Sequence, residues 1–389
     1  MKNQKVTLSI ILILITFIIG ILLGLLLIDV MKKLPEEAIL QNNFLGFSIL
    51  IVSFVIFLFA SAYIQIIIHE SGHLVCGLLS GYSFISFRIG KYTLVRRDKR
   101  FHIKKYYIPG TGGQCLMMPP QSREGDIPFI LYNSGGVIFN FVFSLLALLF
   151  MIFVYTSVFS DIFFMAFSMV GIIYGFLNII PMKISGITND GYNIRMIKKD
   201  VVSRHIFYMQ LRINGLQTQG MRLRYMPEDW FHISEDLNTI NGFHLSMFLL
   251  RGSWYMEQFR FDEAQECLNS IRPFEQNLPG LFQLELQSEL LFLEMVGTCQ
   301  PDVISELYTD NIKQYLEKYQ NYLFSKKRIL YTYTLIVKED YMAAENLYND
   351  ALTMKDNYPN LGEANSELDI MNHIRSLKND SDSGMISDL

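Results

Sequence analysis

The sequence contains few cysteines, and nothing in their spacing pairs them. There are four in 389 residues, Cys76, Cys115, Cys267 and Cys299, and no two are arranged as CxxC. This argues against a disulfide framework of the kind that holds small secreted domains together. Isolated cysteines are typical of a chain whose water-exposed part lies in a reducing compartment.

Charged residues are scarce in the first half of the chain, where long apolar segments dominate. Hydrophobic residues make up 51% of the sequence, which is high for a soluble protein. Segments at 7–28, about 45–79, 128–159 and 162–181 are each long enough to cross a bilayer. No small-x-small cleavage site follows the first segment, so we expect a retained anchor. The alternative is one crossing fewer, with a re-entrant bend near Ser160.

Basic residues predict the orientation of these spans. They gather before the first span, in the loop 82–127 and after the last span (Lys2 and Lys5; Arg88 to Arg123; Lys198, Lys199 and Arg204). With four crossings all three clusters fall on one side, which the positive-inside rule makes the cytoplasm. Lys32 and Lys33 fall on the other side and oppose this arrangement. We expect a multi-pass protein of the cell membrane with both termini in the cytoplasm.

The second span ends in His69-Glu70-Ser71-Gly72-His73. Residues four apart share one helix face, so His69 and His73 can direct ring nitrogens at one zinc ion. Glu70 is then placed to take a proton from an attacking water. Ionisable residues within a membrane span are costly, and such positions are functional by default. A chance match and a structural zinc site including Cys76 are the alternatives, but a lone cysteine on an apolar helix is usually a packing residue.

A catalytic zinc site needs a third protein ligand and one position open to water. The carboxylates in or next to the spans are Glu70, Asp161 and Asp190. Asp161 is expected at the opposite membrane face. Asp190 follows the fourth span on the same side as His73, so it is the predicted third ligand.

These elements resemble the site-2 protease family of intramembrane zinc metalloproteases. That family pairs a membrane-embedded HExxH with a later Asn-x-x-Pro and Asp-Gly, matched here by Asn178, Pro181 and Asp190-Gly191. Gly135-Gly136 followed by Asn140 is similar to the small-residue pattern of the family's intervening helix. The resemblance covers about 45–195. The spacer 182–189 is longer than is usual in the family and is not proline-rich.

The resemblance implies the chemistry. His69, His73 and Asp190 would hold Zn²⁺, Glu70 would act as the general base, and Asn178 would steady the oxyanion of the tetrahedral intermediate. An alternative role for Asn178 is to satisfy backbone groups freed by Pro181.

The basic loop after the second span has β-rich composition. Strands are expected at 84–89, 91–95 and 101–108, with a turn at 97–99 and a short apolar run at 115–118. We predict a β-hairpin or small sheet over about 82–118, with an edge that could hold an extended peptide. A basic connector that touches anionic headgroups is the alternative.

After about residue 192 acidic residues exceed basic ones and the periodicity becomes helical. Segments 254–273 and 331–359 each resemble a tetratricopeptide-type helix pair that ends in a proline. We predict a juxtamembrane linker at 196–239, a helical-repeat cytoplasmic domain at 240–378 and a disordered tail at 379–389. A plain helical bundle is the alternative for the repeat domain.

The predicted fold is mainly α, with a polytopic membrane core of about four spans, a small β insert and a soluble tetratricopeptide-like helical-repeat domain. An anchor and outer loop occupy 1–44 and the zinc peptidase core 45–195. The predicted function is zinc-dependent hydrolysis of membrane-embedded or membrane-associated peptides near the cytoplasmic face. The alternative is a non-catalytic membrane scaffold whose helical domain binds a peptide or protein partner. We expect the lipid bilayer but no nucleic acid among the partners, and a zinc transporter ranks last because the first and third spans carry no ligands.

Overall fold

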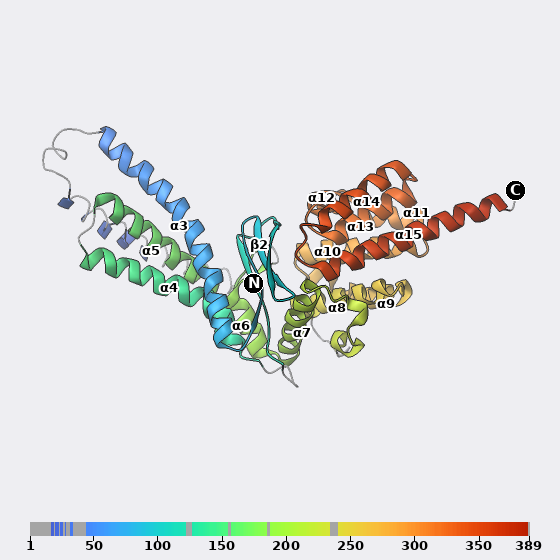
Figure 1. Ribbon diagram of the computed structural model, residues 1–389, viewed down its shortest axis with the longest axis horizontal. Helices are drawn as coiled ribbons and strands as arrows, with labels where there is room; N and C mark the ends of the chain where they lie inside the picture. The colour runs from blue at the N-terminus through green and yellow to red at the C-terminus, as the bar shows by residue number, and fades with distance from the viewer. Residues whose placement is uncertain are drawn as a thin grey trace. The chain divides into compact units, whose positions relative to one another are not determined.

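The computed structural model describes most of the chain from residue 44 onward and a few residues before it. The described residues are 17–18, 20–22, 24–25, 28, 32–33, 44–121, 127–154, 157–184, 187–233 and 240–387. The first predicted span, 7–28, therefore lies largely outside them. The chain divides into two compact units, which are described separately (Figure 1). The membrane unit comprises 1–80, 128–182 and 188–194, and the helical unit comprises 81–127, 183–187 and 195–389.

Three long helices form most of the membrane unit. They are α3 (Phe44–Leu79), α4 (Phe129–Phe153) and α5 (Val158–Ile179), and each packs against the other two. All three are long and apolar enough to cross a membrane, so these predicted spans are confirmed as helices. Side chains such as Phe59 and Phe153, both more than 70% exposed, suit contact with lipid. Ser157 caps α5 through the backbone N–H of Ser160, so this region starts a separate helix rather than a re-entrant bend.

Glycines allow α3 and α4 to approach closely. A β-carbon on Gly72 would lie 2.2 Å from the carbonyl oxygen of Gly135, and one on Gly135 would lie 2.3 Å from that of Gly72. Neither position accepts a side chain without separating the helices. Small residues at such crossings are typical of helix packing in membranes. Cys76 is buried at the same crossing, which agrees with a packing role.

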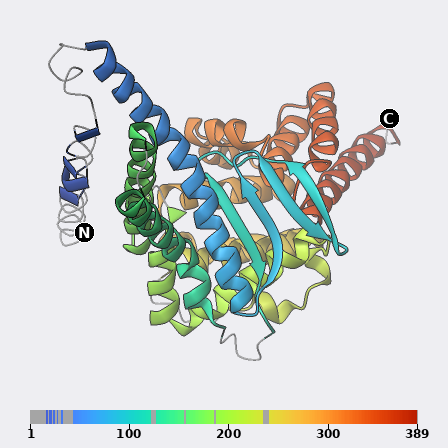
Figure 2. The same cartoon turned by 60° about the vertical axis from the view of Figure 1, so that its left-hand side comes forward.

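The predicted β region is a four-stranded antiparallel sheet in the helical unit (Figure 2). Its strands are β1 (Ser83–Ile89), β2 (Tyr92–Arg97), β3 (Arg100–Lys105) and β4 (Gly113–Met118), in the order β3-β2-β1-β4. Asp98 and Lys99 form the two-residue turn between β2 and β3, with φ of 49° and 61°. Positive φ at both positions is the geometry of a type I′ hairpin, which matches the twist of the strands.

The division into units differs from the predicted domains in two respects. The sheet packs with the helices that follow the membrane core: Tyr106 donates a hydrogen bond to the Tyr322 carbonyl (2.9 Å) and its ring contacts Tyr358. The predicted linker 196–239 contains the end of α6 (Asp190–Lys199) and all of α7 (Val201–Thr218). Ile206 and Phe231 in this range belong to the same core as the later helices. Helical periodicity alone did not reveal which apolar residues share a core.

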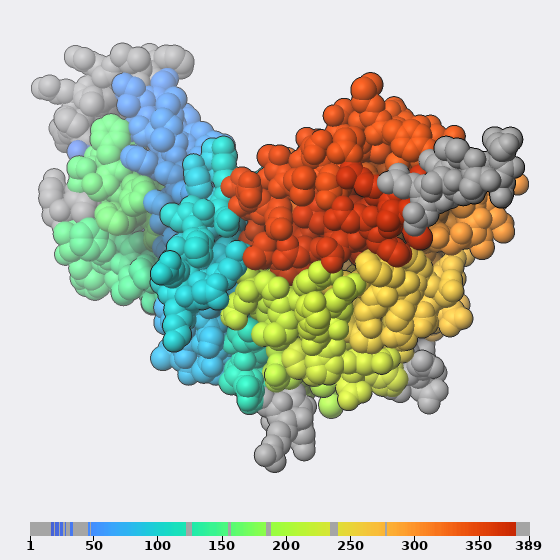
Figure 3. All heavy atoms as spheres, turned by 45° about the vertical axis from the view of Figure 1, so that its right-hand side comes forward, coloured from blue at the N-terminus to red at the C-terminus, as the bar shows by residue number. Residues whose placement is uncertain are grey.

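Helices after α7 build the rest of the helical unit. They are η1 (Leu223–Tyr225), η2 (Glu228–Phe231), α8 (Gly242–Glu257), α9 (Phe261–Asn269), η3 (Arg272–Asn277), α10 (Gly280–Val296), α11 (Pro301–Leu307), α12 (Asp310–Tyr319), α13 (Phe324–Thr332), the π-helical η4 (Tyr333–Val337), α14 (Tyr341–Lys355) and α15 (Leu361–Ser387). α15 packs against α7 and α8, and Figure 3 shows it in red above them. Its backbone is helical to Ser387, which differs from the disordered tail predicted over 379–389.

Three helix pairs in this unit turn in the same way. The turns between α8 and α9, α10 and α11, and η4 and α14 contain Phe259, Cys299 and Glu339, whose φ angles are 62°, 50° and 54°. The positions 259, 299 and 339 are spaced 40 residues apart. Non-glycine residues seldom adopt positive φ, so its recurrence at one spacing marks a common turn. The two segments that suggested repeats, 254–273 and 331–359, each contain one of these turns.

Candidate metal centre

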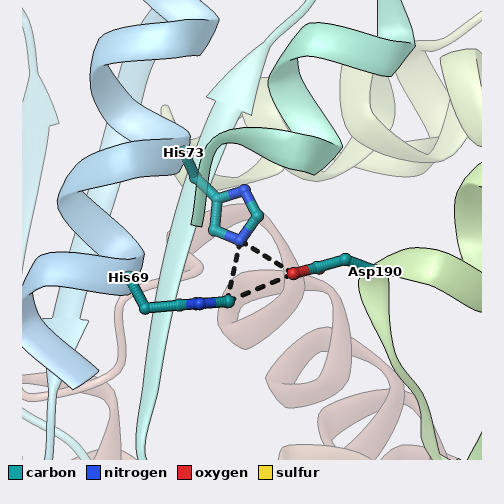
Figure 4. Close-up of side chains that lie close together, drawn as sticks. All are labelled: His69, His73 and Asp190. Carbon is teal, nitrogen blue, oxygen red and sulfur yellow. Dashed lines mark hydrogen bonds and ion pairs between the residues drawn. The ribbon is translucent and has the colours of Figure 1, made fainter. Parts of the chain in front are cut away.

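His69 and His73 lie one turn apart on α3 and face Asp190 at the start of α6 (Figure 4). The two Nε2 atoms are 3.1 Å apart. The Asp190 Oδ2 atom lies 3.2 Å from Nε2 of His69 and 3.4 Å from Nε2 of His73. All three residues belong to the membrane unit, and they are the group of potential metal ligands found among the described residues. The three residues predicted as metal ligands are therefore brought together.

Hydrogen bonds to the other ring nitrogens fix the histidine tautomers. Nδ1 of His73 lies 2.8 Å from the carbonyl oxygen of Tyr132, which only accepts, so this nitrogen carries the proton. Nδ1 of His69 lies 2.7 Å from Oδ1 of Asn140. The Asn140 amide nitrogen donates to both oxygens of Gln65, at 3.0 and 2.8 Å, which fixes its orientation and makes Nδ1 of His69 a donor too. In the neutral rings both Nε2 atoms then present lone pairs.

With both rings neutral, three lone-pair atoms converge: the two Nε2 atoms and Oδ2 of Asp190. Oδ2 of Asp190 is buried and has no hydrogen-bond partner among the described residues. A cation held between these three atoms would relieve the repulsion among their lone pairs. Ligands at zinc distances of about 2.0–2.1 Å in a tetrahedron are about 3.3 Å apart, close to the observed separations. The residues fit a zinc ion.

Asn189 and Gly191 position Asp190, although sequence analysis assigned no role to either residue. The Asn189 side chain donates to the carbonyls of Leu177 (2.6 Å) and Ile180 (2.5 Å), and its Oδ1 accepts from the backbone N–H of Tyr192 (3.0 Å). It thereby ties the start of α6 to the end of α5. The sequence contains a signal for this role of Asn189, because asparagine directly before a helix is a preferred N-cap residue. A β-carbon on Gly191 would lie 2.0 Å from the Ile179 carbonyl oxygen, so only glycine allows this approach.

A buried hydrogen-bond chain holds the histidine-bearing face of α3. The Gln65 amide donates to the Phe167 carbonyl on α5 at 3.1 Å and accepts a hydrogen bond from the Asn140 amide on α4. The Asn140 Oδ1 atom in turn accepts from Nδ1 of His69. Partners of this kind orient metal-binding histidines and raise their basicity. Gly136 is required beside them, since a β-carbon there would lie within 2.6 Å of the His69 ring. The pattern of Gly135-Gly136 followed by Asn140 therefore has a local physical cause, whereas Gln65 was not predicted from the sequence.

The other predicted site residues lie around this cluster. Glu70 follows His69 on α3, is half-buried, and is close enough to His73 for its charge to act on that ring. Asn178 lies at the end of α5 and donates to the Tyr174 carbonyl at 3.0 Å, without a described contact to the three ligands. Cys76 is not part of the ligand group among the described residues.

No protein-family model matches the chain, and no curated protein and no solved structure matches it. The motifs and the geometry above are therefore the basis for any functional assignment.

Proposed function

We propose that this protein is an intramembrane zinc endopeptidase similar to the site-2 proteases. The observation that carries the proposal is the convergence of His69, His73 and Asp190 through three lone-pair atoms, beside Glu70, in a unit of candidate membrane spans. A zinc ion held there supplies Lewis acidity, which polarises a peptide carbonyl and makes water a nucleophile at neutral pH.

The chain's own groups have separate tasks in this proposal. Glu70 accepts the proton of the attacking water and delivers it to the leaving amine. Asn178 donates to the oxyanion of the tetrahedral intermediate. An asparagine amide carries two N–H groups, so its bond to the Tyr174 carbonyl leaves one for this purpose. Asn140 and the Tyr132 carbonyl hold both histidines in the tautomer that presents Nε2.

The arrangement of the spans supports cleavage near the cytoplasmic face. His73 is near the end of α3, Tyr132 near the start of α4, and Asp190 follows the end of α5, so the site lies at one end of the helices. The basic loop and Lys198 and Lys199 favour the cytoplasm for that end. Lys33, which opposed this orientation, lies 2.5 Å from the fully buried Asp161 at the start of α5. That ion pair gives Lys33 a structural partner, while Lys32 and Lys33 still oppose this orientation.

The substrate class follows from the chemistry. A peptide bond inside a helix is shielded, so the substrate must be extended where it is cleaved. β3 is an edge strand whose Phe101 and Ile103 are more than 60% exposed, which suits addition of an extended strand. Membrane-anchored regulators, remnant signal peptides and small peptide precursors all meet these requirements.

Substitution of Glu70 by glutamine tests the proposal. Wild type, Glu70→Gln and the surface control Glu306→Gln are produced in membranes, and the membrane peptides are compared by mass spectrometry. We expect about one zinc per chain in all three and a peptide fragment that is missing only with Glu70→Gln. Full proteolysis by Glu70→Gln would show that the mechanism is wrong.

A scaffold that binds a partner through a tetratricopeptide-like array is the second candidate. The repeated turn at 259, 299 and 339 favours it, because stacked helix pairs build extended binding surfaces. In this case Glu70→Gln changes no membrane peptide, and a co-purifying partner is retained by the variant.

A further inference from the structure

The helical unit contains a cavity with a volume of about 220 Å³. Four glutamates line it, Glu285 and Glu289 on α10 and Glu363 and Glu367 on α15. We call it the glutamate cavity. Pockets for drug-sized ligands measure about 300–1,000 Å³. The glutamate cavity therefore suits a single group the size of a side chain.

Two buried cations from α13 neutralise part of this negative charge. Nζ of Lys326 lies 2.6 Å from Glu285 and 3.5 Å from Glu289. Arg328 binds Glu289 and Glu367, each at 2.5 Å. Both cations are 1% exposed or less. Four carboxylates thus share two cations among the described residues, which leaves negative charge in excess.

The excess negative charge is assigned most clearly to Glu363. Its carboxylate accepts hydrogen bonds from the Tyr358 hydroxyl (2.8 Å) and the Asn360 amide (3.0 Å), which are both neutral. Burial, together with the charges of Glu367 and Glu285, raises the pKa of Glu363 to about 7. A further cation in the cavity would stabilise its ionised form.

Gln217 on α7 is a second, independent sign of a ligand. Its side chain lines the cavity, is 4% exposed and makes no hydrogen bond to another described residue. Buried amides in proteins are nearly always hydrogen-bonded. Its carbonyl oxygen is thus available to an N–H donor that enters between the glutamates. The rest of the wall is aliphatic (Leu223, Leu249, Leu250, Met256 and Ile370).

We propose that the glutamate cavity binds an alkylguanidinium group. A guanidinium carries one positive charge and five N–H donors in a planar fork, which matches carboxylates and an amide oxygen that converge from α7, α10 and α15. The alkyl stem packs against the aliphatic wall while the charged end reaches the glutamates. The group belongs either to a free small molecule or to an arginine side chain of a peptide. This binding is separate from the proposed proteolysis and needs no metal.

Calorimetric titration of the full-length protein in detergent tests this site. The probes are agmatine and a capped Ala-Arg-Ala peptide, and the control is the same peptide with citrulline, the uncharged isostere of arginine. We expect at least one arginine-type probe to bind about tenfold more tightly than the citrulline peptide. Binding of agmatine alone identifies a small-molecule site, and binding of both probes identifies a side-chain site. Equal binding of the arginine and citrulline peptides, with no agmatine binding, would overturn the proposal.

Variants place the binding in the cavity. Glu363→Gln keeps an acceptor for Tyr358 but removes the charge, and we expect about tenfold weaker binding. Gln217→Glu adds a negative charge and should tighten binding, so the two cavity variants should change the affinity in opposite directions even if one is less stable.

Glu306→Gln removes an exposed charge of the same unit and should leave guanidinium binding unchanged. Glu70→Gln and zinc chelation should leave guanidinium binding unchanged, which separates failure of this site from failure of the peptidase proposal. Unchanged binding by both cavity variants would contradict the assignment.

Discussion

Lys326 and Arg328 in the helical unit are buried beside carboxylates, whereas His69, His73 and Asp190 in the membrane unit turn two ring nitrogens and one carboxylate oxygen toward one another. In the first cluster each positive charge has two glutamate partners within 4 Å. In the second, three lone pairs meet and one buried oxygen has no hydrogen-bond partner among the described residues. Side-chain cations therefore stabilise the first cluster, while in the second the proposed zinc ion would supply the positive charge.

Removal of the third proposed zinc ligand should have the largest effect, and it acts on the cluster in the membrane unit. In Asp190→Ala only the two histidines remain, and two protein ligands do not make a stable zinc site. We expect zinc content to fall from about one per chain to near zero, with proteolysis lost, as measured by elemental analysis of the purified protein. Glu306→Gln serves as the control. Retention of full zinc by Asp190→Ala would mean that another residue completes the site.

Removal of a buried cation should destabilise the helical unit. Arg328→Met leaves Glu289 and Glu367 without their shared partner, and breaking a buried ion pair in this way costs about 3–5 kcal/mol. Both tryptophans, Trp230 and Trp254, lie in this unit, so urea unfolding followed by their fluorescence reports on it. The exposed Lys313→Met should change the free energy of unfolding by less than about 0.5 kcal/mol. Equal stabilities of the two variants would contradict the role assigned to the buried charges.

Glu363 should make the helical unit less stable as the pH rises. Its folded-state pKa, about 7, is above the ordinary glutamate value of 4.5, so the folded state holds a proton that the unfolded state has lost. The free energy of unfolding should therefore fall between pH 4.5 and pH 7, by up to about 3 kcal/mol. Glu363→Gln should flatten this dependence in the same fluorescence experiment. An equally steep pH dependence in the variant would assign it to another group.

The smallest of these effects concerns the tautomer of His69. Asn140→Ala removes the acceptor for Nδ1, and loss of such a partner typically weakens metal binding about 10- to 100-fold. Competition with a zinc chelator measures this change. Ser168→Ala removes a similarly buried polar group of the same unit, whose hydroxyl bonds the Ser144 carbonyl, and should leave zinc affinity unchanged. If both variants weaken zinc binding equally, general packing rather than His69 orientation is responsible.

Local sequence patterns predicted much of the candidate metal centre. The spacing of His69 and His73 places them on one helix face in any helix, and few carboxylates near the spans left Asp190 as the candidate. Asn189 and Gln65 escaped notice because each acts through backbone and side-chain partners that are distant in the sequence. The Lys326-Lys327-Arg328 run would ordinarily be expected on a solvated surface, yet all three are 2% exposed or less.

The sequence by itself determined the membrane helices, the β-rich loop and the histidine pair, because each depends on the order and spacing of neighbouring residues. Only the tertiary structure decided that the sheet and 195–233 belong with the helical unit, that Asn189 closes the spacer before Asp190, and that four glutamates share one cavity. These features depend on contacts between residues far apart in the chain. Such contacts are set by which surfaces pack together, and no periodicity or motif records that.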